Sequence, residues 1–199
     1  MERYYDEVLG IETLGYREWD DEPEYYRCES TPYRALAQLA KDFPLKEEHH
    51  VVDFGCGRGR VSFYLHHLFN LRVTGIELHE ETFAELKENE QSYLQRKDLE
   101  ESPFTFLQCH VEDFIPEDQD VFYFFNPFSV KIFRKVLANI ERSLEKKDRE
   151  CYLILYYPFI DYKYYLEKYT TFEKVLRIRL DWEEDEREKF IIYRHLPLY

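Results

Sequence analysis

The ten residues VVDFGCGRGR, at positions 51–60, place three glycines at alternate positions directly after a short apolar run. Asp53 precedes Gly55 by two positions, and Gly57 and Gly59 follow. Clustered glycines lower the stability of a chain unless the backbone needs their unusual torsion angles or a close approach. A strand that ends in such a turn and continues as a helix presents backbone N–H groups and a positive helix end to a ligand. The stretch therefore predicts a strand–turn–helix unit with a ligand site at the end of its strand.

Hydrophobic periodicity extends this unit in both directions. Nearly continuous apolar strands that alternate with helices predict a parallel sheet covered on both faces. The last two strands are joined by an acidic turn and predict an antiparallel hairpin. The expected strands lie within residues 49–54, 71–78, 103–114, 118–128, 150–159, 171–180 and 188–196, and the expected helices within residues 31–43, 59–70, 79–97, 129–144 and 161–169.

These elements predict an α/β fold: a doubly wound, Rossmann-like, mostly parallel seven-stranded sheet with an antiparallel C-terminal hairpin and a short N-terminal helical extension. No linker, repeat or low-complexity block interrupts the 199 residues, so we expect one domain, 1–199. Within it, residues 1–48 are expected to form a lid or helical extension. Thr31 is expected to cap a helix whose first residue is Pro32.

The charge and composition of the chain limit the classes of partner that it can bind. The net charge is −14, and the cations of residues 134–149 alternate with acids, which is typical of a solvated helix face. Because a protein that follows phosphates needs a basic surface, nucleic acid is an unlikely substrate. No apolar run approaches the length of a membrane span, and no signal peptide is evident. The widely spaced cysteines, Cys28, Cys56, Cys109 and Cys151, favour reduced thiols, so we expect a cytoplasmic protein without a membrane partner.

The glycine spacing decides between two ligand classes. A dinucleotide turn has the pattern G-x-G-x-x-G or A, but counting from Gly55 the sixth position is Arg60. The pattern present is an acid, Asp53, followed by G-x-G-x-G. It resembles the first motif of the class I S-adenosylmethionine-dependent methyltransferases, and specifically a broad bacterial group of unknown substrate. The resemblance implies S-adenosylmethionine as cofactor, held in part by Asp53 and the three glycines.

Later strand ends agree with this resemblance. Glu77 ends the second strand, and its two carboxylate oxygens suit the two ribose hydroxyls. In the resembled family an acid after the third strand binds the adenine amino group, a role that implies Asp113, with Glu112 as the competitor. Asn126 begins Asn-Pro-Phe at the end of the fourth strand, where the family places methyl transfer. Asn126 is therefore expected to contact both donor and acceptor.

An upstream polar and aromatic segment completes the set. Thr31 and Tyr33 resemble a short segment that covers the cofactor in some methyltransferases, so Thr31 is a candidate cofactor contact and Tyr33 a candidate catalytic or aligning residue. The paired histidines, His49-His50 and His66-His67, diverge in a strand or a helix and predict no metal site.

The sequence thus predicts an enzyme that transfers a methyl group to an unidentified acceptor, preferably a small molecule or a protein side chain. An alternative is a non-catalytic module of the same fold that binds S-adenosylmethionine or a partner. An NAD-dependent oxidoreductase is a third, which the glycine spacing disfavours.

Overall fold

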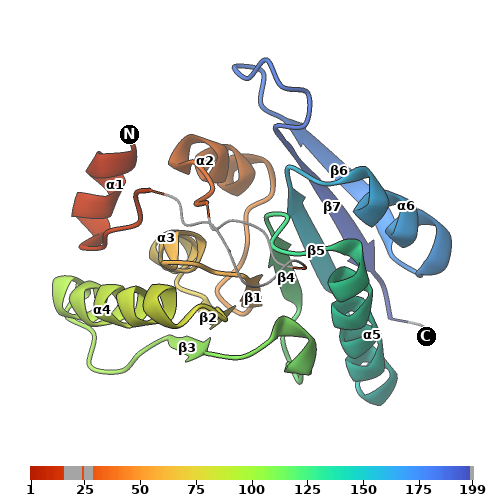
Figure 1. The fold of residues 1–199 in the computed structure, drawn as a ribbon, viewed down its shortest axis with the longest axis horizontal. Helices are drawn as coiled ribbons and strands as arrows, with labels where there is room; N and C mark the ends of the chain where they lie inside the picture. Colours follow the sequence, from red (N-terminus) through yellow and green to blue (C-terminus); the bar gives the residue numbers. More distant parts are fainter. Residues whose placement is uncertain (16–23, 25–28, 198–199) are drawn as a thin grey trace.

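The computed structural model describes residues 1–15, 24 and 29–197. They form a seven-stranded sheet in the order β3-β2-β1-β4-β5-β7-β6 (Figure 1). Strands β1 to β5 run parallel to one another, and β7 runs antiparallel to both β5 and β6. The strands are β1 (His50–Phe54), β2 (Arg72–Ile76), β3 (Phe104–Leu107), β4 (Val121–Phe124), β5 (Cys151–Tyr156), β6 (Glu173–Arg179) and β7 (Lys189–His195).

Helices cover both faces of this sheet (Figure 1). Two clusters of buried apolar side chains lie on the two faces of the sheet. Helices α2 to α4 pack in one cluster, and α5 and α6 pack in the other. The helices are α1 (Glu2–Leu9), α2 (Tyr33–Asp42), α3 (Arg60–Phe69), α4 (Glu80–Lys97), η1 (Val111–Asp113, a 3₁₀ turn), α5 (Val130–Lys146) and α6 (Ile160–Tyr169). The predicted doubly wound, Rossmann-like architecture with its C-terminal hairpin is confirmed.

The strand order creates a switch point between β1 and β4. From β1 the chain continues outward to β2 and β3, and it then returns to β4 on the other side of β1. The turns that leave the carboxyl ends of two such neighbours diverge, and the crevice between them is where ligands bind in these sheets. The glycine turn follows β1, and Asn126-Pro127 follows β4. The fold therefore brings these two sequence motifs to the same crevice.

The start of α2 differs from the prediction. Pro32 is the N-cap of α2, and no side chain caps the helix. Thr31 is not the cap because its hydroxyl instead bonds the hydroxyl of Tyr123, on β4, at 2.8 Å. At α5 a side-chain cap is present, since Ser129 Oγ accepts a hydrogen bond from the backbone N–H of Ile132.

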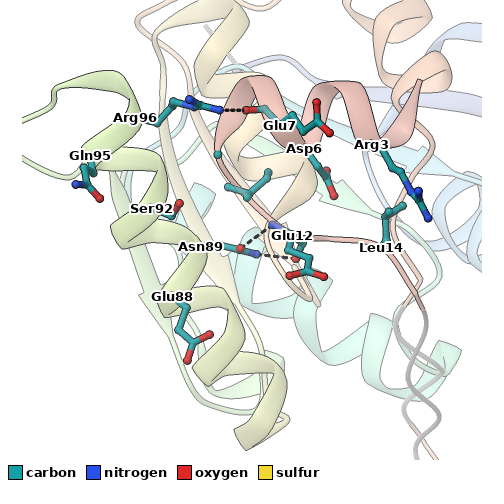
Figure 2. A pocket seen from close by; sticks show the side chains of 12 residues that line it. Arg3, Asp6, Glu7, Glu12, Leu14, Glu88, Asn89, Ser92, Gln95 and Arg96 are labelled. Carbon is teal, nitrogen blue, oxygen red and sulfur yellow. Dashed lines mark hydrogen bonds between the residues drawn. The ribbon is translucent and has the colours of Figure 1, made fainter.

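The N-terminal residues form a helix, α1, within the segment that was expected to be a lid or helical extension. The segment after α1 is tied to α4 by Asn89, whose side-chain amide accepts from the Glu12 N–H at 2.8 Å and donates to the Glu12 carbonyl at 3.0 Å. Figure 2 shows these two bonds at the edge of an open surface hollow of about 970 Å³ between α1 and α4. Long-range hydrogen bonds, rather than the local pattern, hold this segment in place.

The structure also bears on the expected reduced thiols and on the expected absence of a membrane span. Cys28 lies outside the described residues, while Cys109 and Cys151 are free thiols. Across the described ranges, every helix is too short or too polar to cross a bilayer.

Candidate functional site

The glycine turn adopts a backbone that only glycine takes without strain. The φ angles of Gly55, Gly57 and Gly59 are 72°, 56° and 87°. A Cβ on Gly55 would lie 2.7 Å from Cβ of Pro127, and a Cβ on Gly59 would lie 2.6 Å from Cδ1 of Leu86. Two of the glycines are therefore required by the close packing of the protein itself, before any ligand is considered.

The same close approach joins the two motifs of the crevice. Gly55 lies directly against Pro127, so the turn after β1 touches the turn after β4. The N–H groups of Gly55 and Cys56 both donate to the carbonyl of Ile76, at 2.9 and 3.0 Å. These bonds hold the glycine turn over the end of β2, where Glu77 follows.

Glu77 is almost fully buried and faces the turn. Its Oε2 accepts from the N–H of Gly57 at 3.0 Å, and its Oε1 accepts from the N–H of His79 at 2.8 Å. Each carboxylate oxygen has two acceptor positions, so further hydroxyl groups can bind to the same two atoms. The structure thus places Glu77 beside the glycines, as its predicted ribose role requires.

Asp53 lies below the turn, on β1, and is 3% exposed. Ser62 Oγ donates to its Oδ2 at 2.9 Å. The pKa of the Asp53 carboxyl is raised to about 7, chiefly by burial; the hydrogen bonds from Ser62 lower it, and the charge of Glu77 raises it. Two neighbouring buried carboxyls form a site suited to a cationic ligand.

Asn126 connects the turns after β4 and β5. Its φ of 39° is in the left-handed region, which asparagine tolerates better than most residues. Its side-chain nitrogen donates to the carbonyl of Tyr157, and its side-chain oxygen accepts from the N–H of Phe159 at 3.2 Å. Asn126 therefore shapes the rim of the crevice by joining two strand ends.

A small cavity of about 20 Å³ lies over the glycine turn. It has room for about one water molecule. Residues 29–31 form part of its lining, so a larger ligand requires the lining to move. The lining residues are Glu29, Ser30, Thr31, Asp53, Phe54, Gly55, Cys56, Gly57, Arg60, Val61, Tyr123 and Phe125.

Arg60 is the functional candidate that the sequence did not single out. It is 5% exposed, and its guanidinium donates to Thr13 Oγ1 at 2.7 Å, to the carboxylate of Glu2 and to the carbonyl of Thr31 at 3.3 Å. It therefore fastens both α1 and residues 29–31 to the first turn of α3. In the sequence, its one visible signal is its position directly after the glycine turn.

Tyr33 is placed away from the cavity lining. Its ring is fully buried, lies under the Arg60 guanidinium at 4.6 Å, and its hydroxyl donates to Asp6 Oδ1 at 2.6 Å. The structure therefore brings Thr31 to the cavity and directs Tyr33 into the packing beneath α1.

The two acids after β3 lie on η1, at the same edge of the sheet. Glu112 pairs with Lys135 of α5 at 3.2 Å, whereas Asp113 is exposed. Asn139 holds η1 against α5 by donating to the carbonyl of Glu112 at 2.7 Å. Neither acid lines the small cavity in this conformation, and neither do Glu77 and Asn126.

Residues 51–147 match a sequence family described as a methyltransferase domain. These residues, just under half of the chain, carry the sequence of a methyltransferase domain. The family and fold predicted from the sequence are thereby confirmed, and S-adenosylmethionine is the methyl donor of that family. No curated protein has detectable sequence similarity to the chain.

Several solved structures share the fold. A proposed RNA methyltransferase from Pyrococcus horikoshii is 20% identical, with a TM-score of 0.62 over 100% of this chain and 99% of that one. The glycopeptide N-methyltransferase MtfA, in complex with S-adenosylmethionine, is 11% identical, with a TM-score of 0.62 over 82% of this chain and 87% of that one. The tRNA (uracil-54, C5)-methyltransferase of Pyrococcus abyssi is 13% identical, with a TM-score of 0.57 over 81% of this chain, which spans only 38% of that enzyme. These similarities establish the fold.

Proposed function

We propose that this chain is an S-adenosylmethionine-dependent methyltransferase that acts on a small molecule or a protein side chain. The observation that carries the proposal is the pair of buried carboxyls, Asp53 and Glu77, that flank the glycine turn at the switch point of the sheet. Bound there, S-adenosylmethionine would supply an electrophilic methyl group. The protein contributes chiefly by placing the acceptor in line with that group.

Each candidate residue has a role that follows from its position. Glu77 would accept hydrogen bonds from ribose hydroxyls through the two oxygens that already hold Gly57 and His79. Asp53 would place negative charge below the cationic end of the donor. Thr31 would close the site from above, and residues 1–48 as a whole would act as its cover, within a single domain of residues 1–199.

The remaining candidates are assigned to the rim. Asn126 would set the shape of the acceptor entrance through its bonds to Tyr157 and Phe159. Glu112 or Asp113 would bind the adenine amino group once the cavity opens toward η1. Tyr33 would act as a positioning residue, because it supports Arg60 and so residues 29–31.

Calorimetric titration with S-adenosylmethionine, and in parallel with NAD, tests the donor assignment. We expect binding of the first ligand alone, and a Glu77→Gln variant should weaken it by at least about tenfold, because the amide retains one acceptor oxygen and loses the charge. A Glu88→Gln variant, at an exposed position of α4, is the matched control. Absence of binding, or an unchanged affinity in Glu77→Gln, would overturn the assignment.

Transfer itself is tested by incubation with methyl-labelled S-adenosylmethionine and cell extract. We expect label in a small-molecule or protein fraction. Binding without label in any fraction would instead indicate a non-catalytic module of the same fold.

A further inference from the structure

A second hollow, of about 450 Å³, lies between α6 and the β6–β7 hairpin and is called here the α6–hairpin groove. Figure 1 shows α6 lying along this hairpin, on the same face of the sheet as α5. Four of its lining side chains are cationic: Lys163, Lys174, Arg177 and Lys189. Such a cluster of cationic side chains is unexpected on a chain whose net charge is −14, and it suggests a binding role.

The groove is lined by four cations and by one acid, Glu167, which also lies near Lys163, while Glu186 lies near Lys189. Lys174 pairs with Glu167 at 2.9 Å. In the part of the chain that the structure describes, Lys163, Arg177 and Lys189 form no ion pair. Arg177 is exposed, while Lys163 and Lys189 are half-buried, so water screens the three groups unequally. The groove thus holds an excess of positive charge.

The cations also repel one another. Arg179 and Lys189 are directly opposite in the β6–β7 register, an arrangement that destabilises an antiparallel pair when the charges are alike. Burial lowers the pKa of Lys189, the charges of Arg177 and Lys163 lower it further, and the charge of Glu186 partly opposes them. An anion bound in the groove would relieve this repulsion.

Hydrogen bonds link the groove to Asn126, at the predicted acceptor entrance. The carbonyl of Lys189 accepts from the N–H of Tyr157 at 3.0 Å, and the carbonyl of Tyr157 in turn accepts from the side chain of Asn126. At the other wall, α6 starts directly after Phe159, whose N–H is bonded to Asn126 Oδ1 at 3.2 Å. Both walls of the groove are therefore anchored to Asn126.

The shape and chemistry indicate the kind of ligand. A volume of about 450 Å³ is that of a small-molecule site. Guanidinium groups bind phosphate oxygens in pairs, and lysines add point charges. Ile160 and Tyr164, which are 74% and 55% exposed, give the rim an apolar surface. A long polyanion would need a continuous basic track, which the acidic remainder of the chain does not provide.

We propose that the α6–hairpin groove binds a phosphate group carried by a small-molecule methyl acceptor. The proposal rests on the proposed methyltransferase function, because it assigns the substrate class of the same site. The phosphate end would lie between Arg177 and Lys189, and the remainder of the acceptor would extend toward Asn126.

Inorganic pyrophosphate is the probe for this proposal. We expect it to bind the full chain with a Kd of about 1 mM or below in low salt, and an Arg177→Gln/Lys189→Gln double variant to raise that Kd at least about tenfold. Lys46→Gln/Lys131→Gln removes the same charge from exposed sites elsewhere and should leave the Kd within about twofold. Thermal unfolding of each variant shows that it is folded.

Two results would overturn the proposal. One is the absence of pyrophosphate binding, and the other is an equal Kd in the wild-type chain and the double variant. A single-stranded oligonucleotide is tested in the same way. If it binds more than about 100-fold tighter than pyrophosphate and depends on the same two cations, the groove serves nucleic acid and the small-molecule assignment is wrong.

A separate titration of the wild-type chain with S-adenosylmethionine keeps this proposal and the proposed function distinguishable. Pyrophosphate binding without S-adenosylmethionine binding would refute the methyl donor while leaving an anion site in the groove. The reverse result would refute the groove alone.

Discussion

The buried carboxyl of Asp53 leads to a quantitative prediction about Asp53→Asn. The folded protein retains this proton up to a pKa of about 7, whereas the ordinary value is 3.8. As the pH rises between these values, the unfolded state releases its proton first, so the folded state loses stability. At about 1.4 kcal/mol per pH unit, the full effect is on the order of 4 kcal/mol above about pH 7.

Asparagine removes this cost while keeping the local hydrogen bond. Its side-chain oxygen can accept from Ser62 Oγ as Oδ2 of Asp53 does at 2.9 Å. We therefore expect Asp53→Asn to be more stable than the wild-type chain at about pH 8. Between about pH 5 and about pH 8 the difference in unfolding free energy should grow by about 3 kcal/mol. Any pH-independent change in packing cancels in this comparison.

Urea unfolding at these two pH values, without ligand, is the assay. The exposed Asp181, on the β6–β7 hairpin, provides the control Asp181→Asn, which should shift the unfolding free energy by less than about 0.5 kcal/mol. An Asp53→Asn difference that stays constant within about 0.5 kcal/mol would refute the reasoning, because it would mean that Asp53 ionises in the folded state as it does in the unfolded state. The same variant should bind S-adenosylmethionine more weakly, since it lacks the charge below the donor.

Substitutions at three further positions test the packing around the glycine turn. Gly55→Ala should lower the unfolding free energy by about 2–4 kcal/mol, because the position has positive φ and the new methyl group would overlap Pro127; urea unfolding measures this. Thr31→Val should cost about 1–3 kcal/mol in the same assay by leaving the buried hydroxyl of Tyr123 without its partner, whereas Thr31→Ser should cost less. Arg60→Lys keeps the charge but loses the planar fork, so amide hydrogen exchange in α1 should accelerate at least about tenfold; unchanged protection would contradict the clamp.

The local pattern of the sequence was sufficient for the sheet and for the two central motifs. Apolar strands alternating with amphipathic helices predict a doubly wound sheet because both periodicities are properties of neighbouring residues. The spacing of Gly55, Gly57 and Gly59 distinguished a methyltransferase turn from a dinucleotide turn for the same reason. Glu77 could be placed at the end of the second strand because a strand end can be located from the chain alone.

Other features depended on contacts between distant residues. Nothing near Thr31 in the sequence indicates that its hydroxyl bonds Tyr123, 92 positions away, rather than capping α2. Likewise, Gly55 is required because Pro127 packs against it, and that contact exists only once β1 and β4 are neighbours.

Tyr33 and Arg60 show most clearly the difference between what local sequence predicts and what long-range contacts decide. Their sequence positions suggested an aligning tyrosine and a residue that merely fails a dinucleotide pattern. The tertiary structure stacks the guanidinium on the tyrosine ring and surrounds both with Glu2, Asp6 and Thr13. The sequence by itself determined the fold and the location of the crevice, since these follow from local periodicity and turn chemistry. The tertiary structure decided which polar groups are buried together, because desolvation makes each of them depend on partners that are distant along the chain.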